Sequence, residues 1–366
     1  MADTLSRYDL WLAFALKCSP SNYFRLVGRH GSARDVFDAA ARNELSFEGR
    51  NAEKVKAELH QKAEESYIDS CLAYLKKRGI HAALLGDESY PELLKHIHNP
   101  PPVLFFKGRL KSDIALPLAI IGSRKCTSYG KKMAFSLAGE LTKAGACVVS
   151  GLAYGIDAQS AAGALSVKES DFPTVAVLGC GVDVVYPKDN ENLYGEIIGR
   201  GAVVSEFLPG TAPHPSNFPR RNRIISGMSR GLVVVEAASR SGTSITANFA
   251  LEQGRDVFAV PGCITDPMSE GTNRLIADGA AKITLSAADV LEEYGLRAYV
   301  EAAQREEKQV LAGEQKTICD LLAMGEKSFD ELSDLTGLSM GILNSTLTEL
   351  EFSGIIKQSP GRIYEI

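Results

Sequence analysis

Between residues 115 and 285 the sequence alternates short β-branched runs with amphipathic helical runs, and few folds have this pattern. The β-branched runs are almost continuously apolar, as expected for strands that a sheet buries on both faces. Strand and helix in alternation predict an α/β fold with a doubly wound, mostly parallel sheet and helices on both faces. The expected strands are PLAIIG (117–122), CVVSG (147–151), TVAVLG (174–179), AVVSEF (202–207), GLVVVEA (231–237), DVFAVPG (256–262) and AKITL (281–285).

The segments on either side of this region have different patterns. Residues 1–85 carry apolar residues at helical spacing, with Gly and Ser breaks between the runs, which predicts a small helical domain. Residues 314–366 have the outline of a winged-helix domain, with three helices, N-caps at Ser328 and Ser339, and a hairpin around Pro360-Gly361. The expected division is a helical domain at 1–85, an α/β domain at 86–290, a linker at 291–313 and a winged helix at 314–366.

Composition excludes several classes of protein. Hydrophobic residues make up 45% of the chain and charged residues 23%, as in globular proteins with a core. We expect neither a signal peptide nor a membrane segment, because no apolar stretch approaches roughly 20 residues. The seven cysteines form no CxxC pair and have no ligand spacing with the six histidines. We therefore expect no metal site and no disulfide framework, and scattered thiols fit a reducing cytoplasm.

Two stretches without acidic residues, 114–139 and 207–235, concentrate positive charge in a chain of net charge −5. Both belong to strand-to-helix loops, so we expect them to meet at the carboxyl edge of one sheet, where ligands bind. Arginines neutralise phosphates, and the ring of Phe218 suits stacking on an unpaired base. Thr127 or Ser128 can cap the helix after the first strand, whose N-terminus attracts an anion. The alternative is a solvated basic surface with a buried Phe218.

Glycine-rich turns follow other strands of the predicted sheet. Gly151 and Gly155 flank a turn into a helix, and Asp157 falls in the first turn of that helix, where we expect it to cap; the alternative is contact with a ligand. Ser241 and Gly242 precede another helix start that offers a phosphate cradle. The candidate nucleic-acid-binding residues are Gly122, Ser123, Arg124, Lys125, Gly151, Gly155, Phe218, Arg220, Arg221, Asn222, Arg223, Ser241 and Gly242.

The central domain also carries a series of motifs in a fixed order. In sequence and order they resemble the DprA family, also called Smf or DNA-processing protein A. The flanks resemble that family in outline only, with a sterile-alpha-motif-like N-terminal domain and a C-terminal winged helix. The motifs are IIGSR (120–124), SGLAYGID (150–157), VLGCGVDVVYP (177–187), SEFLPG (205–210), FPRRNRIISGMS (218–229), VVEAASRSGTSITA (234–247), GRDVFAVPG (254–262) and EGTNRLIADGA (270–280).

The resemblance implies an extended Rossmann fold that binds single-stranded DNA. It further implies a protein that protects incoming strands during natural transformation, loads the recombinase RecA onto them for homologous recombination, and acts as a homodimer. It implies no catalytic turnover and no cofactor. The dimer surface would lie within about 255–285, although no individual residue of it can be named.

The resemblance also implies roles for individual residues. Arg124, with its neighbours Gly122 and Ser123, would contact the DNA backbone, and Phe218 would meet a base. The family's RNR motif matches the stretch from Arg221 through Asn222 to Arg223. Arg223 has a structural alternative, since it can pair with Glu236 or Glu206. Some members have a lysine before the FP pair, where this chain has HPSN, so Arg220 would take over that phosphate contact.

Two other functions compete with this interpretation. One is a nucleotide-binding hydrolase resembling the cytokinin-activating phosphoribohydrolases, which carry a PGGxGTxxE pattern. Here the comparable stretch is SRSGTSITA, with Thr246 at the position of the glutamate. The sequence offers no Ser-His-Asp set, metal cluster or Walker lysine, so we expect no catalytic residue.

The other alternative is a regulator that binds duplex DNA through the winged helix. Residues 314–366 hold nine acidic and four basic residues, a net charge of 4 − 9 = −5. The expected recognition helix, SMGILNSTLTELEF, has no basic residue. Binding to duplex phosphates requires positive charge, so we expect this domain to serve a protein-protein or regulatory role instead.

Overall fold

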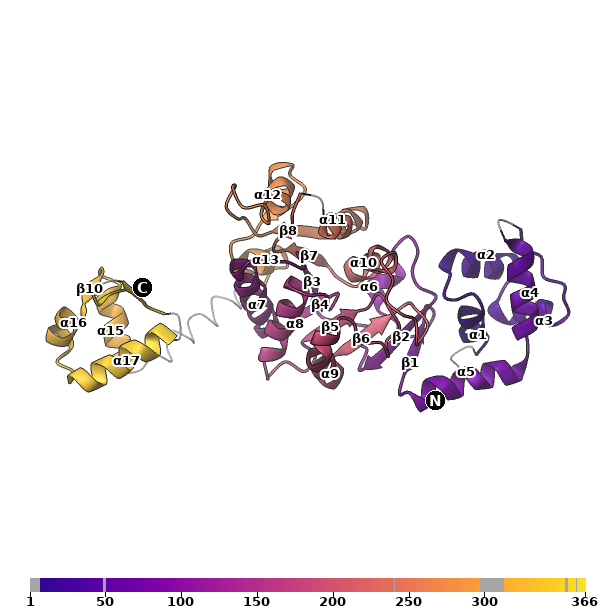
Figure 1. The fold of residues 1–366 in the computed structure, drawn as a ribbon, viewed down its shortest axis with the longest axis horizontal. Coiled ribbons are helices and arrows are strands. Elements are labelled where there is room, and N and C mark those ends of the chain that lie inside the picture. The colour runs from indigo at the N-terminus through magenta and orange to yellow at the C-terminus, as the bar shows by residue number, and fades with distance from the viewer. Residues whose placement is uncertain (1–6, 49–50, 240, 297–312, 353–354, 360) are drawn as a thin grey trace. The chain divides into compact units, whose positions relative to one another are not determined.

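The computed structural model describes residues 7–48, 51–239, 241–296, 313–352, 355–359 and 361–366 (Figure 1). The chain divides into two units, Met1–Tyr294 and Gly295–Ile366. The first contains a nine-stranded sheet in the order β1-β2-β6-β5-β4-β3-β7-β8-β9. Its strands are β1 His81–Leu84, β2 Val103–Gly108, β3 Pro117–Ile121, β4 Cys147–Ser150, β5 Thr174–Val177, β6 Ala202–Ser205, β7 Gly231–Val234, β8 Asp256–Ala259 and β9 Lys282–Ile283.

Strands β3 to β9 are the seven strands that the sequence predicts, and all pairs among them are parallel. The order β5-β4-β3-β7-β8-β9 is that of a doubly wound dinucleotide-binding sheet, which reverses between β3 and β7. The prediction of a mostly parallel α/β sheet is therefore confirmed. Strands β1 and β2 were not predicted; β2 extends the sheet by pairing antiparallel with β6, and β1 pairs antiparallel with β2. The sheet thus begins at residue 81, inside the segment expected to be helical.

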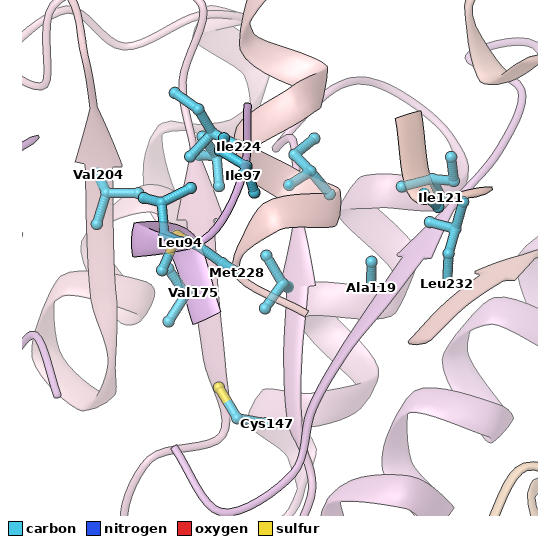
Figure 2. Close-up of a cluster of buried hydrophobic side chains, with 14 of the residues drawn as sticks. Leu94, Ile97, Ala119, Ile121, Cys147, Val175, Val204, Ile224, Met228 and Leu232 are labelled. Carbon is cyan, nitrogen blue, oxygen red and sulfur yellow. The ribbon is translucent and has the colours of Figure 1, made fainter. Parts of the chain in front are cut away.

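Helices cover both faces of the sheet because successive strand residues point to opposite sides. Val175 and Val204 pack in one cluster with Ile224 of α10, as Figure 2 shows, whereas Ala176 and Val203 pack in a second cluster on the other side. The helices are α6 Glu92–Lys95, α7 Ser128–Lys143, α8 Ile156–Ser166, α9 Glu191–Arg200, α10 Asn217–Gly227, α11 Gly242–Glu252, α12 Glu270–Ala277 and α13 Ala287–Glu293, with a 3-10 helix at Lys188–Asn190.

Five helices precede the sheet and have a core of their own. Trp11, Phe37 and Leu59 lie in this core, and the Trp11 indole donates to the carbonyl of Lys62 at 2.7 Å. The described helices of the chain include none that is both long and apolar enough to cross a membrane. The five helices are α1 Arg7–Ala15, α2 Pro20–His30, α3 Ala33–Ala41, α4 Ala52–Lys62 and α5 Glu65–Lys77.

The second unit has the predicted winged-helix pattern. Ser328 caps α16 in a capping box with Glu331, and Ser339 Oγ accepts from the amide of Ile342, so both expected N-caps are confirmed. The expected linker begins inside α13, which includes residues 291–293 and ends at Glu293. Residues 297–312 and Pro360 lie outside the described part of the chain. The elements are α15 Glu314–Leu322, β10 Lys327–Ser328, α16 Phe329–Thr336, α17 Met340–Phe352, β11 Lys357–Ser359 and β12 Ile363–Glu365.

Candidate functional site

A shallow pocket lies at the carboxyl ends of four adjacent strands, β3, β4, β5 and β6. Each strand end supplies one prominent side chain to its lining. Arg124 follows β3, Tyr154 follows β4, Tyr186 follows β5, and Phe218 follows β6 at the start of α10. The two basic stretches that the sequence singles out therefore do meet at one edge of the sheet.

The pocket is aromatic with one exposed cation. The rings of Tyr186 and Phe218 lie 5.5 Å apart and are tilted by 34°. The Arg124 guanidinium carbon lies 5.0 Å from the centroid of Phe218, a cation–π arrangement. Gly179 allows the close approach of Phe218, since a Cβ there would lie only 2.7 Å from the ring. The exposed Tyr186 ring and the half-buried Phe218 ring, beside an exposed guanidinium, can bind a flat apolar group that carries a negative charge.

Arg221 lies in the interior, although its place in a basic stretch without acidic residues predicts a contact with DNA. Its side chain is 3% exposed, and Nη1 donates to the carbonyl of Gly151 at 2.8 Å and to that of Val177. Burial lowers the pKa of Arg221 to about 10, against the attraction of the Asp157 carboxylate. Arg221 thereby links α10 to the ends of β4 and β5 beneath the pocket.

Asp157 holds the turn between β4 and α8. Its carboxylate accepts from the amides of Gly151 at 3.0 Å and Ala153 at 3.4 Å, which lie in the loop before α8, so Asp157 fixes the turn and does not cap the helix as expected. Burial raises the pKa of Asp157, and the Arg221 guanidinium opposes that rise. The turn that presents Tyr154 is therefore fixed by a buried carboxylate and a buried guanidinium.

Arg220 and Arg223 share one buried carboxylate. Arg223 Nη2 lies 2.5 Å and Arg220 Nη2 lies 2.9 Å from Oε2 of Glu206, which is 1% exposed. The structural alternative for Arg223 is confirmed, with Glu206 rather than Glu236 as its partner. Arg220 Nη2 also donates to the carbonyl of Cys18 at 2.7 Å. The guanidinium expected to replace the missing lysine is thus turned toward the protein.

A carboxylate occupies the reversal point of the sheet between β3 and β7. The buried Glu236 accepts from the amide of Thr127 at 2.9 Å and from its hydroxyl at 2.5 Å. Thr127 in turn caps α7 by accepting from the amide of Gly130, as expected. A side chain at Gly130 would collide with this carboxylate. The N-terminus of α7, expected to attract an external anion, is therefore already neutralised from within.

Gly122 and Gly155 pack the loop after β3 against α8. A Cβ on Gly122 would lie 2.6 Å from Ile156 Cγ1. Gly155 has a φ of +75°, and a Cβ there would collide with the carbonyl oxygen of Ser123. The Ser123 amide donates to the carbonyl of Glu236 at 2.8 Å. These three residues shape the loop that presents the exposed pair Arg124 and Lys125, rather than leaving backbone open to a ligand.

Asn222, Ser241 and Gly242 lie outside the lining of the pocket. The Asn222 amide group donates to the carbonyl of Gly242 at 3.5 Å, so these residues join α10 to α11. Gly242 is exposed and has open space at its Cβ position. The start of α11 is therefore accessible, but the structure does not bring it into the group around Phe218.

Tyr154, Tyr186 and Gly179 line the pocket and were not singled out as site residues from the sequence. The signal was present, because SGLAYGID and VLGCGVDVVYP each place a tyrosine after a glycine-rich turn of the sheet. Both rings are exposed, and the Tyr154 hydroxyl donates to Asp189 at 2.9 Å. An aromatic residue next to such a turn therefore indicates a binding-site residue when an adjacent strand supplies another aromatic residue.

Comparison with known proteins gives a consistent result. Residues 81–295 match the family model of DNA recombination-mediator protein A, and residues 301–362 match that of the DprA winged helix domain. DNA processing protein DprA of Bacillus subtilis is 40% identical over 244 residues, covering 65% of this chain and 80% of the relative. Protein Smf of Escherichia coli is 37% identical over 304 residues, covering 80% of this chain and 79% of the relative.

Two solved structures are similar to this chain. The X-ray structure of DNA processing protein A (DprA) from Streptococcus pneumoniae has a TM-score of 0.66 and 34% identity, covering 80% of this chain and 99% of that one. A structure of DNA processing protein A from Helicobacter pylori, which concerns its single-stranded DNA binding mode, has a TM-score of 0.51 and 26% identity. It covers 63% of this chain and 98% of that one.

Proposed function

Since this chain belongs to the DNA recombination-mediator protein A family, the DprA family of DNA-processing proteins, we propose that it binds single-stranded DNA. The binding site is the pocket between Arg124, Tyr154, Tyr186 and Phe218. The Helicobacter pylori relative, whose structure concerns its single-stranded DNA binding mode, supports the choice of ligand.

The observation that carries the proposal is the Arg124 guanidinium over the Phe218 ring next to Tyr186. A base must expose a face in order to stack on an aromatic ring, which a single strand permits and a duplex prevents. The guanidinium lies close enough to the rings to neutralise the phosphate of a base bound there. The exposed Lys125, Lys131 and Lys132 supply further charge on the same loop and helix.

The remaining arginines have a supporting role in this proposal. Arg221 and Arg223 bind buried carbonyl and carboxylate groups, so they fix α10 and the turns that present the aromatic rings. The nucleotide-hydrolase alternative loses support, because Glu236 fills the crevice where a doubly wound sheet binds phosphates. Thr246, at the position of that family's glutamate, is buried.

The test is a fluorescence anisotropy titration of the whole protein with oligo-dT and a matched duplex at two salt concentrations. We expect tighter, salt-sensitive binding of the single strand. Equal or stronger duplex binding would contradict the proposal and favour the winged-helix regulator. Absence of binding to either would also contradict it, and release of free base from nucleoside monophosphates would then be measured.

We propose further that the bound strand is passed to the RecA recombinase in the cytoplasm, as the family's description as a recombination mediator suggests. The expected homodimer has a suitable surface at the edge strand β9, where Ile283 and Leu285 are exposed. A strand at the edge of a sheet has unpaired backbone groups that a second copy can bind. Light scattering of the double variant Ile283→Asp, Leu285→Asp should then show a monomer where the wild type is dimeric, and an unchanged mass would place the dimer surface elsewhere.

A further inference from the structure

The two loops that present the aromatic rings of the pocket are both attached to the helices at the N-terminus. The β5 loop, residues 178–187, contains Tyr186 near its end, and the β6 loop, residues 206–216, leads into Phe218. We propose that the N-terminal helical module, residues 7–78, positions these two loops and so sets the geometry of the single-strand site. This inference rests on the proposed function.

A carboxylate ties both loops to the end of α5. Asp183 of the β5 loop has a side chain that is 6% exposed. Its Oδ2 accepts from Arg78 Nη1 at 2.7 Å, and its Oδ1 accepts from the amide of Gly210 in the β6 loop at 2.6 Å. The Arg78 guanidinium also lies over the ring of Tyr74 on α5. One buried carboxylate therefore connects three segments, with Arg78 as the contribution of the module.

A second polar contact reaches the start of α10. The carbonyl of Cys18, at the end of α1, accepts from Arg220, which lies two residues after Phe218. Lys17 and Cys18 both have left-handed backbone angles, with φ of 51° and 53°, which form the tight turn that ends α1. Arg220 also binds Glu206, so the turn after α1 is joined to both ends of the β6 loop.

Apolar contacts support the same arrangement. Leu10 of α1 and Leu75 of α5 share a core cluster with Val182 of the β5 loop and with Leu208 of the β6 loop. The loops also bind one another, since the amide of Gly181 donates to the carbonyl of Thr211 at 2.9 Å. Because both loops contact the same module and one another, a shift of the module would change the separation and tilt of Tyr186 and Phe218.

The test compares two arginines of the module. Arg78→Ala removes the contact with Asp183, whereas Arg42→Ala removes an exposed ion pair with Glu44 that touches neither loop. We expect Arg78→Ala to weaken oligo-dT binding about fivefold or more without changing the salt slope, because no phosphate contact is lost. Arg42→Ala should bind as the wild type does. In a Phe218→Ala background the effect of Arg78→Ala should disappear, since it acts through the aromatic pair.

Hydrogen exchange of the free protein provides a readout that needs no DNA. Arg78→Ala should accelerate amide exchange in the β5 and β6 loops relative to Arg42→Ala, and Arg78→Lys should restore most of the protection. If the wild type binds no single-stranded DNA, the proposed function is wrong. The hydrogen-exchange rates would still show whether the module holds the β5 and β6 loops in place. Unchanged exchange and affinity in Arg78→Ala would overturn the inference. A reduced salt slope would also overturn it, because Arg78 would then be a phosphate contact.

Discussion

At the scale of single residues, Arg124 and Arg221 both lie in basic stretches, but Arg124 is exposed at the pocket and Arg221 is buried in the fold. Arg124 is exposed over Phe218, so Arg124→Ala should weaken single-strand binding. It should also reduce the magnitude of the slope of log affinity against log salt by about 0.7, the contribution of one phosphate of a single strand. Anisotropy titrations over a salt series measure this. An unchanged slope would remove Arg124 from the site.

Arg221→Ala should act on the fold. Its guanidinium is buried, compensates Asp157 and binds two carbonyl groups. We expect the free energy of unfolding to fall by about 3 kcal/mol, as when one partner of a buried charged network is removed. Urea unfolding monitored by circular dichroism measures this change. Wild-type stability combined with a reduced salt slope would instead make Arg221 a phosphate contact, as its place in the RNR motif suggested.

Phe218→Ala should cost about 1–3 kcal/mol of binding free energy if a base stacks on the ring. Phe218→Tyr keeps a ring in place and serves as the matched variant that should retain affinity. Because Phe218 also packs against Gly179 and Tyr186, unfolding must be measured in parallel. A folded Phe218→Ala protein with wild-type affinity would leave the ring a packing role only.

The sequence indicated which loops carry the site but not which arginines are free within them. The run RRNR does not distinguish its members, because burial depends on partners that are distant in the chain. Arg221 binds the carbonyl of Gly151, and Arg223 binds Glu206. Arg124 and Lys125 are exposed, so a contact of these two side chains with a phosphate stays a prediction. Tyr154 and Tyr186 were not predicted because they come close to Phe218 only when β4, β5 and β6 lie side by side in the sheet.

At the scale of elements, helix α7 depends on the carboxylate of Glu236, in the loop after β7. Glu236→Gln removes the negative charge from the N-terminus of α7 and weakens the bonds to Thr127. We expect a loss of about 1–2 kcal/mol of unfolding free energy. Glu140→Gln, on the exposed side of the same helix, is the control and should be nearly neutral. Equal stability of the two variants, measured by urea unfolding, would refute the role of Glu236.

The parallel strands could be predicted because a sheet buried on both faces requires continuous apolar runs. The antiparallel strands β1 and β2 gave a weaker signal, since β2 begins with the apolar run VLFF but no alternation of strands and helices surrounds it. β1 is only His81–Leu84, and β2 follows three prolines, which read as a rigid connection. Their place in the sheet is fixed by β6 and by the N-terminal helices, through contacts that sequence periodicity does not contain. Local pattern therefore predicted the doubly wound centre and missed its extension.

At the scale of the whole molecule, charge is divided between the two units. The winged-helix unit carries four basic and nine acidic residues within 314–366, and its helix α17 has none of the basic ones. The rest of the chain has a net charge of −5 − (−5) = 0, and its positive charge is concentrated in the acid-free stretches 114–139 and 207–235. Since affinity for DNA phosphates comes mainly from neutralised charge, this unit should add little to binding of either strand form.

Removal of the winged-helix unit tests this division directly. A chain that ends at residue 296 retains the whole sheet and the pocket, because both lie within the first unit. We expect it to bind oligo-dT and duplex DNA with the affinities and salt slopes of the full chain, since no phosphate contact is removed. Arg124→Ala in the full chain is the comparison that should lose affinity. Selective loss of duplex binding on truncation would show instead that α17 or the wing reads duplex DNA despite its charge.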